Sequence, residues 1–527
     1  MKLWLLGAAG VMLLGSTVYL GSVYSRHNGR TAAAISDEIF AAQRDQIVRL
    51  KERLQALEHG TTLLEAPTRD SHAPPPPPPA EAGAAPSWVE WHRAPPRHTT
   101  PAVVSPGMPA ESTHTCYGRT YNDDYWVENT CVYHNLVYSV DDHAFIYVAH
   151  DKAHAAMVRE SGDLVVSTYP QGFSSRVGPV LEEGKLVPTV ISKAEFAAKY
   201  GKRGMVEVKN VHVIYESYNA ENFGHFLTDE LYPAFSALSS FDLVQPDIQL
   251  LRRVTTKKWR YSCDWQVANW GKEQGEKCAR NYEAFTPLMS TNPVLKLREY
   301  AKGLVSRHLP AGKQSGALIN LGVAVSGFGM LADHCDDPTT HGRRIGSPSH
   351  AVHHNCNRGR QLQLVNFRKW TLQMIGVDPA LQPKVQQVLI WDRAASDYKA
   401  NRKINGFDKL KKRIETEFKI KVVLYESWLG KSAKYQLQTM AESTVFITGV
   451  GSGSHIGWYL PRGGTMVRVC NKNAEPTHME WHIFNYMPHF QVEYVEADKG
   501  KFDEELVMTH VVAGLNRYAL ENGLPTV

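Results

Sequence analysis

The sequence lacks a strong excess of charge of either sign. Its 58 Lys and Arg residues against 53 Asp and Glu residues leave a net charge of +5. A nucleic-acid-binding protein normally gathers its basic residues on one element or one face. Here the basic runs are short, such as 257–258 and 409–413, and runs of this kind are typical of solvated faces. We therefore expect no nucleic-acid partner.

Cysteine is also scarce, and no Asn-x-Ser/Thr glycosylation acceptor occurs anywhere in the chain. Six of the seven cysteines form three pairs that are close in sequence, namely Cys116/Cys131, Cys263/Cys278 and Cys335/Cys356. Such pairs are typical disulfides of a secretory compartment, although six cysteines allow several other connectivities. Cys470, which follows an apolar strand at 465–469, would be the free and buried thiol.

Long uncharged apolar runs are absent apart from 3–24. At about 1.5 Å per residue this run is just long enough to cross a bilayer core of about 30 Å. A cleaved signal peptide, with its shorter apolar region, is the alternative. We expect a retained anchor at 1–25. Lys2 precedes the run and Arg26 and Arg30 follow it, so charge alone does not favour a cytoplasmic N-terminus. The cysteine pairs favour a type II orientation with the head in the lumen.

A stem is expected at 26–115, between the anchor and the catalytic head. It begins with an amphipathic helical stretch at 32–58, which would permit a homodimer, and continues into the six-proline run 74–79. Proline-rich sequence forms an extended spacer without a core, so we expect a disordered stem. The head then divides into an N-terminal domain at 116–375, a C-terminal domain at 376–500 and a closing helix within 501–527.

Residues 386–470 alternate between short apolar runs and amphipathic helical stretches. In chain order these are 387–391, 407–418, 421–425, 434–442 and 444–448. Alternation of this kind predicts an α/β fold with a parallel, doubly wound sheet. In such sheets ligands bind at the carboxyl ends of the strands.

Those predicted strand ends carry chemistry suited to a sugar nucleotide. Arg393 and Arg402, the latter followed by Asn405, suit a diphosphate because guanidinium binds phosphate oxygens in a fork. Glu426 can accept both hydroxyls of a ribose. The alternatives are surface salt bridges for the arginines and a helix cap for the glutamate.

The third strand opens into the small-residue segment Gly449-Val-Gly451-Ser452-Gly453-Ser454-His455. Small residues let backbone N–H groups approach a phosphate at a helix N-terminus, although Gly/Ser turns after strands are common. This is not a Walker loop, because no Gly-Lys-Ser/Thr follows.

The segment Asn222-Phe-Gly224-His225-Phe-Leu-Thr-Asp229 follows a predicted strand at 211–215. His225 and Asp229 are four residues apart and would share one helix face. One interpretation is a helix start in which the histidine hydrogen-bonds the carboxylate. The other is that one of the two is a general base tuned by its neighbour and by the helix end.

Histidine, cysteine and aspartate gather in a long predicted loop at 327–360. Their types fit zinc, but their spacing matches no standard finger, and Cys335 and Cys356 suit a disulfide equally well. We therefore predict no metal site and no cofactor.

In order along 215–470, these segments resemble glycosyltransferase family 61. That family includes plant xylan xylosyl- and arabinosyltransferases and animal luminal O-linked N-acetylglucosaminyltransferases. The matching segments are Asn222–Asp229, Trp391–Arg393, Arg402–Asn405, Glu426 with Gln436, Gly449–Ser454 and Leu460–Gly463. One departure is that many members have a histidine where this chain has Gly451, and His455 lies four residues later.

The resemblance implies a GT-B-like fold, with two Rossmann-type domains facing a cleft, and an inverting, metal-independent reaction. It implies a UDP-sugar donor, held by Arg393, Arg402, Asn405, Glu426 and the 451–455 segment, with Asp229 or His225 as base. The acceptor would be a polysaccharide or glycoprotein in the Golgi. UDP-xylose, UDP-arabinose and UDP-N-acetylglucosamine all fit. The alternative is a degenerate luminal protein that binds glycans without transferring sugar; no carboxylate pair favours a glycoside hydrolase.

Overall fold

The computed structural model describes residues 102–105, 108–117, 130–161, 164, 166–167, 185–216, 220–253, 271–327, 361–392, 404–425, 431–471, 484 and 487–527. All of these residues lie in one compact unit, Pro86–Val527. The predicted anchor, the proline run and the His-rich loop lie outside them. Within the described residues no helix combines the length and apolarity needed to cross a membrane.

The C-terminal sheet confirms the predicted parallel strands. β12 (Gln387–Trp391), β13 (Lys421–Tyr425), β14 (Val445–Thr448), β15 (Gly464–Asn471) and β16 (Phe490–Asp498) pair in parallel in the order β13-β12-β14-β15-β16. Only the short β17 (Lys501–Phe502) is antiparallel to its neighbour β16. Counted along the chain from β12, the parallel strands lie in the doubly wound order 2-1-3-4-5.

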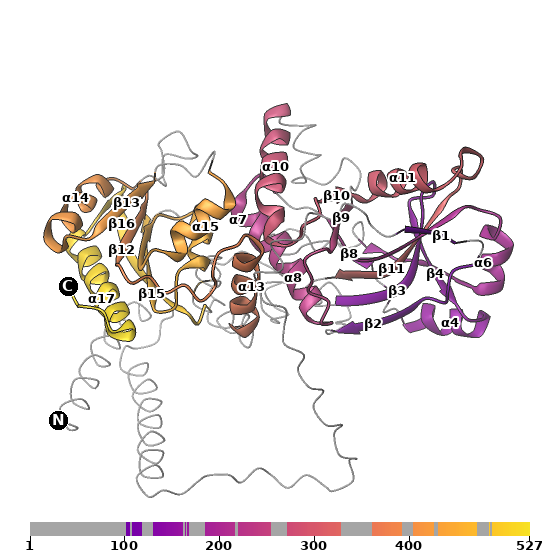
Figure 1. Ribbon diagram of the computed structural model, residues 1–527, viewed down its shortest axis with the longest axis horizontal. Coiled ribbons are helices and arrows are strands. Elements are labelled where there is room, and N and C mark those ends of the chain that lie inside the picture. Colours follow the sequence, from indigo (N-terminus) through magenta and orange to yellow (C-terminus); the bar gives the residue numbers. More distant parts are fainter. Residues whose placement is uncertain are drawn as a thin grey trace, which may run out of the picture. The chain divides into compact units, whose positions relative to one another are not determined.

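Helices cover both faces of this sheet, as the fully buried central strands β12 and β14 require. In β12, Val388 and Ile390 pack in one hydrophobic cluster with α14 (Phe407–Phe418) and α17 (Glu504–Asn522). Leu389 and Trp391 alternate to the other face, where α15 (Ala433–Ala441) packs. Figure 1 shows α14 and α17 on one side of the sheet and α15 on the other. Both α14 and the closing helix α17 therefore confirm the helical spacing read from the sequence.

The N-terminal sheet is mixed, which differs from the expected Rossmann-type sheet. Its main order is β10-β9-β8-β11-β3-β4-β7, and β1 pairs with β8 while β2 pairs with β3. These strands are β1 (Ala102–Ser105), β2 (Thr113–Tyr117), β3 (Thr130–Ser139), β4 (Ala144–Ala149), β7 (Thr189–Ser192), β8 (Met205–Glu216), β9 (Gln249–Arg253), β10 (Leu295–Lys296) and β11 (Leu318–Gly327). Strands β9, β8 and β11 run parallel, but β3 is antiparallel to β11 and β4. The reason is local: the four residues between β3 and β4 are too few for a parallel crossover.

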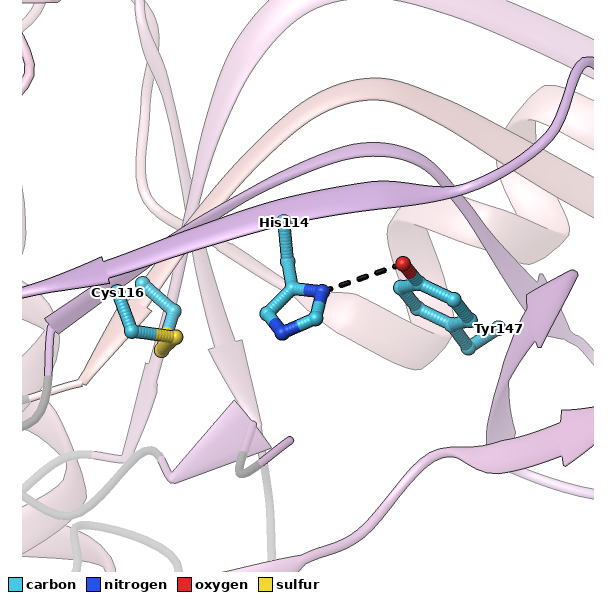
Figure 2. The surroundings of a disulfide bond; sticks show 4 residues. His114, Cys116 and Tyr147 are labelled. Atoms are coloured by element: carbon cyan, nitrogen blue, oxygen red, sulfur yellow. Dashed lines mark hydrogen bonds between the residues drawn. A yellow bond between two sulfur atoms is a disulfide. The ribbon is translucent and has the colours of Figure 1, made fainter. Parts of the chain in front are cut away.

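The folded head begins before residue 116, where the sequence placed its start. β1 pairs antiparallel with β8, Ala102 opposite Val208, so at least 102–115 includes strand rather than stem. The apolar run Ala102–Ser105 lies between prolines, which hid it in the proline-rich sequence. β2 is then joined to β3 by the predicted Cys116–Cys131 disulfide. Figure 2 shows this bond beside His114, whose Nδ1 lies 3.1 Å from the hydroxyl of Tyr147 in β4.

Other helices flank this sheet. α4 (Lys152–Ser161) packs on β4 and β7, and α6 (Lys193–Tyr200) begins at a capping box between Ser192 and Glu195. α11 (Leu297–His308) packs on β8 and β9. Lys272–Phe285 forms helix α10, whose Cys278 and Phe285 are buried.

The free cysteine among the described residues is the one that the sequence predicted. Cys470 is the free and buried thiol, and burial raises its pKa. Cys278 is disulfide-bonded to a cysteine outside the described residues.

The helix α13 (Gln361–Met374) links the N-terminal half to the C-terminal sheet. The helix ends at Met374, and the turn at Gly376, with φ +71°, then redirects the chain. Arg368 is buried on this helix and donates to the carbonyls of Pro379 (2.9 Å) and Tyr459 (3.3 Å). Burial lowers the pKa of Arg368 to about 10. One hydrophobic cluster contains residues of α8 (Tyr232–Ser239), α13, α15 and β12.

Candidate functional site

The strand order places the candidate site at the carboxyl edge of the C-terminal sheet. In a 2-1-3-4-5 sheet the ligand-binding position is the switch point between the first and third strands, here β12 and β14. The register makes Trp391 level with Tyr425 of β13 and with Thr448 of β14. Three strands therefore end together, and the next residues along the chain lead to Arg393, Glu426 and Gly449. Arg393, Arg402 and Glu426 themselves lie outside the described residues.

The loop after β14 packs closely against the end of β12. A Cβ on Gly453 would overlap the indole ring of Trp391, so only glycine fits at this position. Ser454 is fully buried, and both its N–H (2.9 Å) and its hydroxyl (2.7 Å) donate to the carbonyl of Gly451. The small residues here serve close packing, and the Ser454 N–H is already committed within the loop.

Gly451 explains why this chain lacks a histidine at that position. Its φ of +138° lies in a region that favours glycine, and it precedes the 3₁₀ helix η5 (Ser452–Tyr459). A histidine would be strained on this backbone path. The local backbone therefore favours glycine over histidine at position 451.

His455 lies buried in the first turns of η5. Its Nδ1 donates to the carbonyl of Ser452 at 3.2 Å, and its ring centroid is 5.6 Å from that of Phe484. Only 3% of the residue is exposed. The ring therefore supports the loop from inside rather than standing open at its surface.

The loop also contacts the first sequence motif, more than two hundred residues earlier in the chain. A Cβ built on Gly224 would lie 2.9 Å from Nδ1 of His455 and 3.0 Å from Cα of Ser452. Gly224 belongs to the short helix α7 (Phe223–His225), which Asn222 caps by accepting from the Gly224 N–H at 3.0 Å. The structure thus brings together two motifs that the sequence analysis identified separately.

A π-helix follows α7 and was not foreseen from the sequence. It is η1 (Phe226–Leu231), and it leads into α8. π-helical turns are rare and often occur at functional sites. Phe226, Leu227 and Leu231 are buried. His225 ends α7 and Asp229 lies within η1, while the side chains of both lie outside the described parts.

Two other predicted residues occupy different environments. Asn405 is exposed just before α14, and its backbone N–H donates to the carbonyl of Gly500 at 2.8 Å. Gln436 is buried on α15, where its side chain donates to the Lys431 carbonyl at 2.9 Å. Gln436 therefore fixes the start of α15.

Two tyrosines lie where β13 ends. The hydroxyls of Tyr425 and Tyr435 are hydrogen-bonded, and burial, followed by that bond, raises the pKa of Tyr425 to about 12. Tyr435 is 45% exposed, and the Lys431 ammonium lies 5.3 Å from the centroid of its ring. An exposed aromatic ring beside a ligand-binding edge can pack on a flat base or on a sugar face.

Arg468 is a further candidate that the sequence analysis did not single out. It lies fully buried on β15, level with Thr448, and its guanidinium is 5.4 Å from the ring centroid of Phe484 and 5.8 Å from that of Tyr494. Burial raises the pKa of Tyr494, and the Arg468 charge opposes that rise. In the sequence, the only indication of this residue is that it is the one charge within the apolar strand 465–469.

The described residues hold no group of His, Cys, Asp or Glu suited to a metal ion. The predicted His/Cys/Asp cluster at 334–356 lies outside them.

No protein-family model matches the chain, and no curated protein matches it. Among solved structures, E. coli heptosyltransferase WaaC with ADP is 10% identical and has a TM-score of 0.25, covering 58% of this chain and 100% of that chain. The same enzyme with ADP-2-deoxy-2-fluoro heptose is 11% identical with a TM-score of 0.23, covering 57% and 99%. Both similarities are distant, and the fold of the C-terminal half is defined by its own strand order and register.

Proposed function

We propose that this protein is an inverting glycosyltransferase of the family 61 type, which transfers a sugar from a UDP-sugar to a glycan or glycoprotein. The observation that carries the proposal is the packing of Gly224 against Ser452 and His455. It joins the start of the helix bearing His225 and Asp229 to the loop at the switch point of a doubly wound sheet. A base and a nucleotide site belong close together in such a transfer.

The donor would lie at the carboxyl edge of β12, β13 and β14. Arg393 and Arg402 would bind the diphosphate, whose negative charge grows as it leaves, so that their effect is largest in the transition state. Glu426 would bind the ribose, and Asn405 and the 451–455 loop would complete the site. In this proposal the loop acts mainly by its backbone, because Ser454 and His455 are buried.

The acceptor would be activated from the side of α7 and η1. Asp229 or His225 would accept the proton of the acceptor hydroxyl while its oxygen attacks the anomeric carbon, and UDP leaves from the opposite face. One bond forms and one breaks on opposite sides, which inverts the configuration. No metal is needed if the two arginines neutralise the departing diphosphate. We propose the two-domain GT-B arrangement as the frame for this chemistry.

We further propose a location in the Golgi membrane, with anchor 1–25 and stem holding the head in the lumen. The Cys116–Cys131 disulfide supports this, because disulfides persist in oxidising compartments.

Donor binding tests the site directly. Calorimetry with UDP should give binding to the wild type and an affinity at least about tenfold weaker for Arg393→Ala, since one charged hydrogen bond contributes about 1.5–3 kcal/mol. Arg462→Ala, an exposed arginine in the turn before β15, is the matched control and should bind normally. Unchanged UDP affinity in Arg393→Ala would remove this arginine from the diphosphate site.

A further inference from the structure

A separate groove lies between α8, the turn after it and α13. Its volume is about 410 Å³. Ligand-binding pockets commonly span about 300–1,000 Å³, so this groove can hold a small molecule or one or two units of a chain. No residue of the predicted donor site lines it.

The groove has an aromatic floor and a polar rim. Phe235 of α8 and Trp370 of α13 form the floor and are 4% and 8% exposed. Asn366, Lys369 and Gln373 form one side of the rim, since residues three and four apart share a helix face.

Asp242 forms the opposite side of the rim, in the turn that ends α8. Its φ is +55°, and the neighbouring Leu243 N–H donates to the Leu238 carbonyl at 3.0 Å, which closes the helix end. The carboxylate is therefore presented from a fixed turn.

The rim groups are available to a ligand. Among the described residues, the side chains of Asp242, Asn366 and Lys369 form no hydrogen bond or ion pair with one another or with any other group. All three are exposed. The groove thus presents a carboxylate that can accept hydrogen bonds, an amide, and an ammonium group that can donate them, around an apolar floor.

This chemistry selects a neutral polyhydroxyl ligand. One carboxylate offsets the one ammonium, which disfavours phosphates and nucleotides. A protein partner would need about 800 Å² of surface on each side, far more than these few residues offer. Sugars present hydroxyls for amide and carboxylate groups and an apolar C–H face for an aromatic floor.

We propose that this groove is a subsite for a neutral carbohydrate chain, and, resting on the proposed function, that the chain is the acceptor. Ser239 at its edge follows Asp229 by ten residues of nearly continuous helix, a path of roughly 15 Å at about 1.5 Å per residue. The groove therefore holds a sugar unit remote from the reacting hydroxyl. The groove raises the affinity for the carbohydrate acceptor and favours acceptors that are long enough to reach it.

The test compares the double variant Asn366→Ala/Gln373→Ala with the control variant Gln361→Ala. Gln361 belongs to the same helix but lies outside the groove. Saturation-transfer NMR is used with neutral oligosaccharides of xylose, mannose and N-acetylglucosamine. The oligosaccharide that binds is then used as the acceptor in measurements of transfer kinetics. We expect the double variant to lose affinity by about thirtyfold, as removing two hydrogen bonds of about 1 kcal/mol each implies. The acceptor KM should rise with kcat and UDP affinity unchanged, and the control should match the wild type.

Equal oligosaccharide affinity in the double variant and the wild type, or no binding by the wild type, would overturn the inference. Failure of the proposed function looks different: the wild type would bind no UDP, while the groove variants still reduced oligosaccharide binding. A thermal melt confirms that each variant is folded before it is scored.

Discussion

At the scale of single residues, the glycines at the candidate site are explained by contact rather than by flexibility. The sequence suggested that Gly451, Gly453 and their neighbours let a phosphate approach the backbone. The structure shows that Gly453 makes room for Trp391 and that Gly224 makes room for η5. The sequence could identify these positions as small but not the partners, because each partner comes from a distant segment.

Gly453→Ala should destabilise the fold. The new methyl group would overlap the indole ring of Trp391, and overpacking a core usually costs about 1–3 kcal/mol. Gly449→Ala is the matched control, because its Cβ would lie 3.5 Å from Cγ1 of Ile404, an ordinary contact. Urea unfolding measures both. Equal midpoints for the two variants would show that the loop does not need glycine at 453.

Gly224→Ala should reduce sugar transfer while the protein stays folded. The methyl group would push α7 away from Ser452 and His455, and small displacements of catalytic groups can cost about 100-fold in rate. We expect kcat/KM to fall at least about tenfold.

The control is Gly303→Ala in α11, whose Cβ would lie 3.6 Å from the flexible Arg307 guanidinium. It should leave transfer unchanged and stabilise the helix by about 0.5–1 kcal/mol. Loss of transfer in both variants would point to general damage instead of a local effect at α7.

At the scale of elements, the sequence predicted the C-terminal half well and the N-terminal half poorly. The strands at 387–391 and 421–425 were readable because each is a short apolar run bounded by helices of clear amphipathic spacing. The pairings of β8 with β11 and of β3 with β11 join segments that are far apart in the chain and that no local turn connects. η1 could not be foreseen, since its sequence is compatible with an ordinary α-helix.

His212 of β8 couples three elements of the N-terminal half. Its Nδ1 donates to the Val323 carbonyl of β11 at 3.2 Å, and its Nε2 accepts from the Tyr300 hydroxyl of α11 at 3.0 Å. Burial lowers its pKa to about 4 from an ordinary 6.5. Neutral histidine is thus the form that the fold requires.

Acid should therefore destabilise the protein through this residue. Its folded pKa is depressed, so the stabilisation is full above pH 6.5 and is lost as pH falls towards 4, where the unfolded chain alone takes up a proton. The loss is on the order of 3 kcal/mol, since each pH unit corresponds to about 1.4 kcal/mol. His212→Asn should be less stable at pH 8 but show a shallower decline between pH 6.5 and 4 in urea unfolding. Parallel declines in the two proteins would contradict this.

At the scale of the whole molecule, two segments that are far apart in the chain meet at one place. The order of motifs along 215–470 suggested a donor half and an acceptor half, and the contact of Gly224 with Ser452 and His455 joins them. The order alone could not reveal this contact, nor the mixed character of the N-terminal sheet. It also missed Arg468, because one charge in an apolar strand is a weak signal until its burial is known.

The most direct test of the central claim is turnover of UDP-sugars by the purified protein. UDP release would be measured with UDP-xylose, UDP-arabinose and UDP-N-acetylglucosamine, with and without glycan acceptors, for the wild type and folded Asp229→Asn and His225→Asn. The account predicts release from at least one donor, stimulated by acceptor and reduced at least about 100-fold in one of the two variants, within the usual range for a general base. Full activity in both variants, or no turnover of any donor by a wild type that binds glycans, would contradict it.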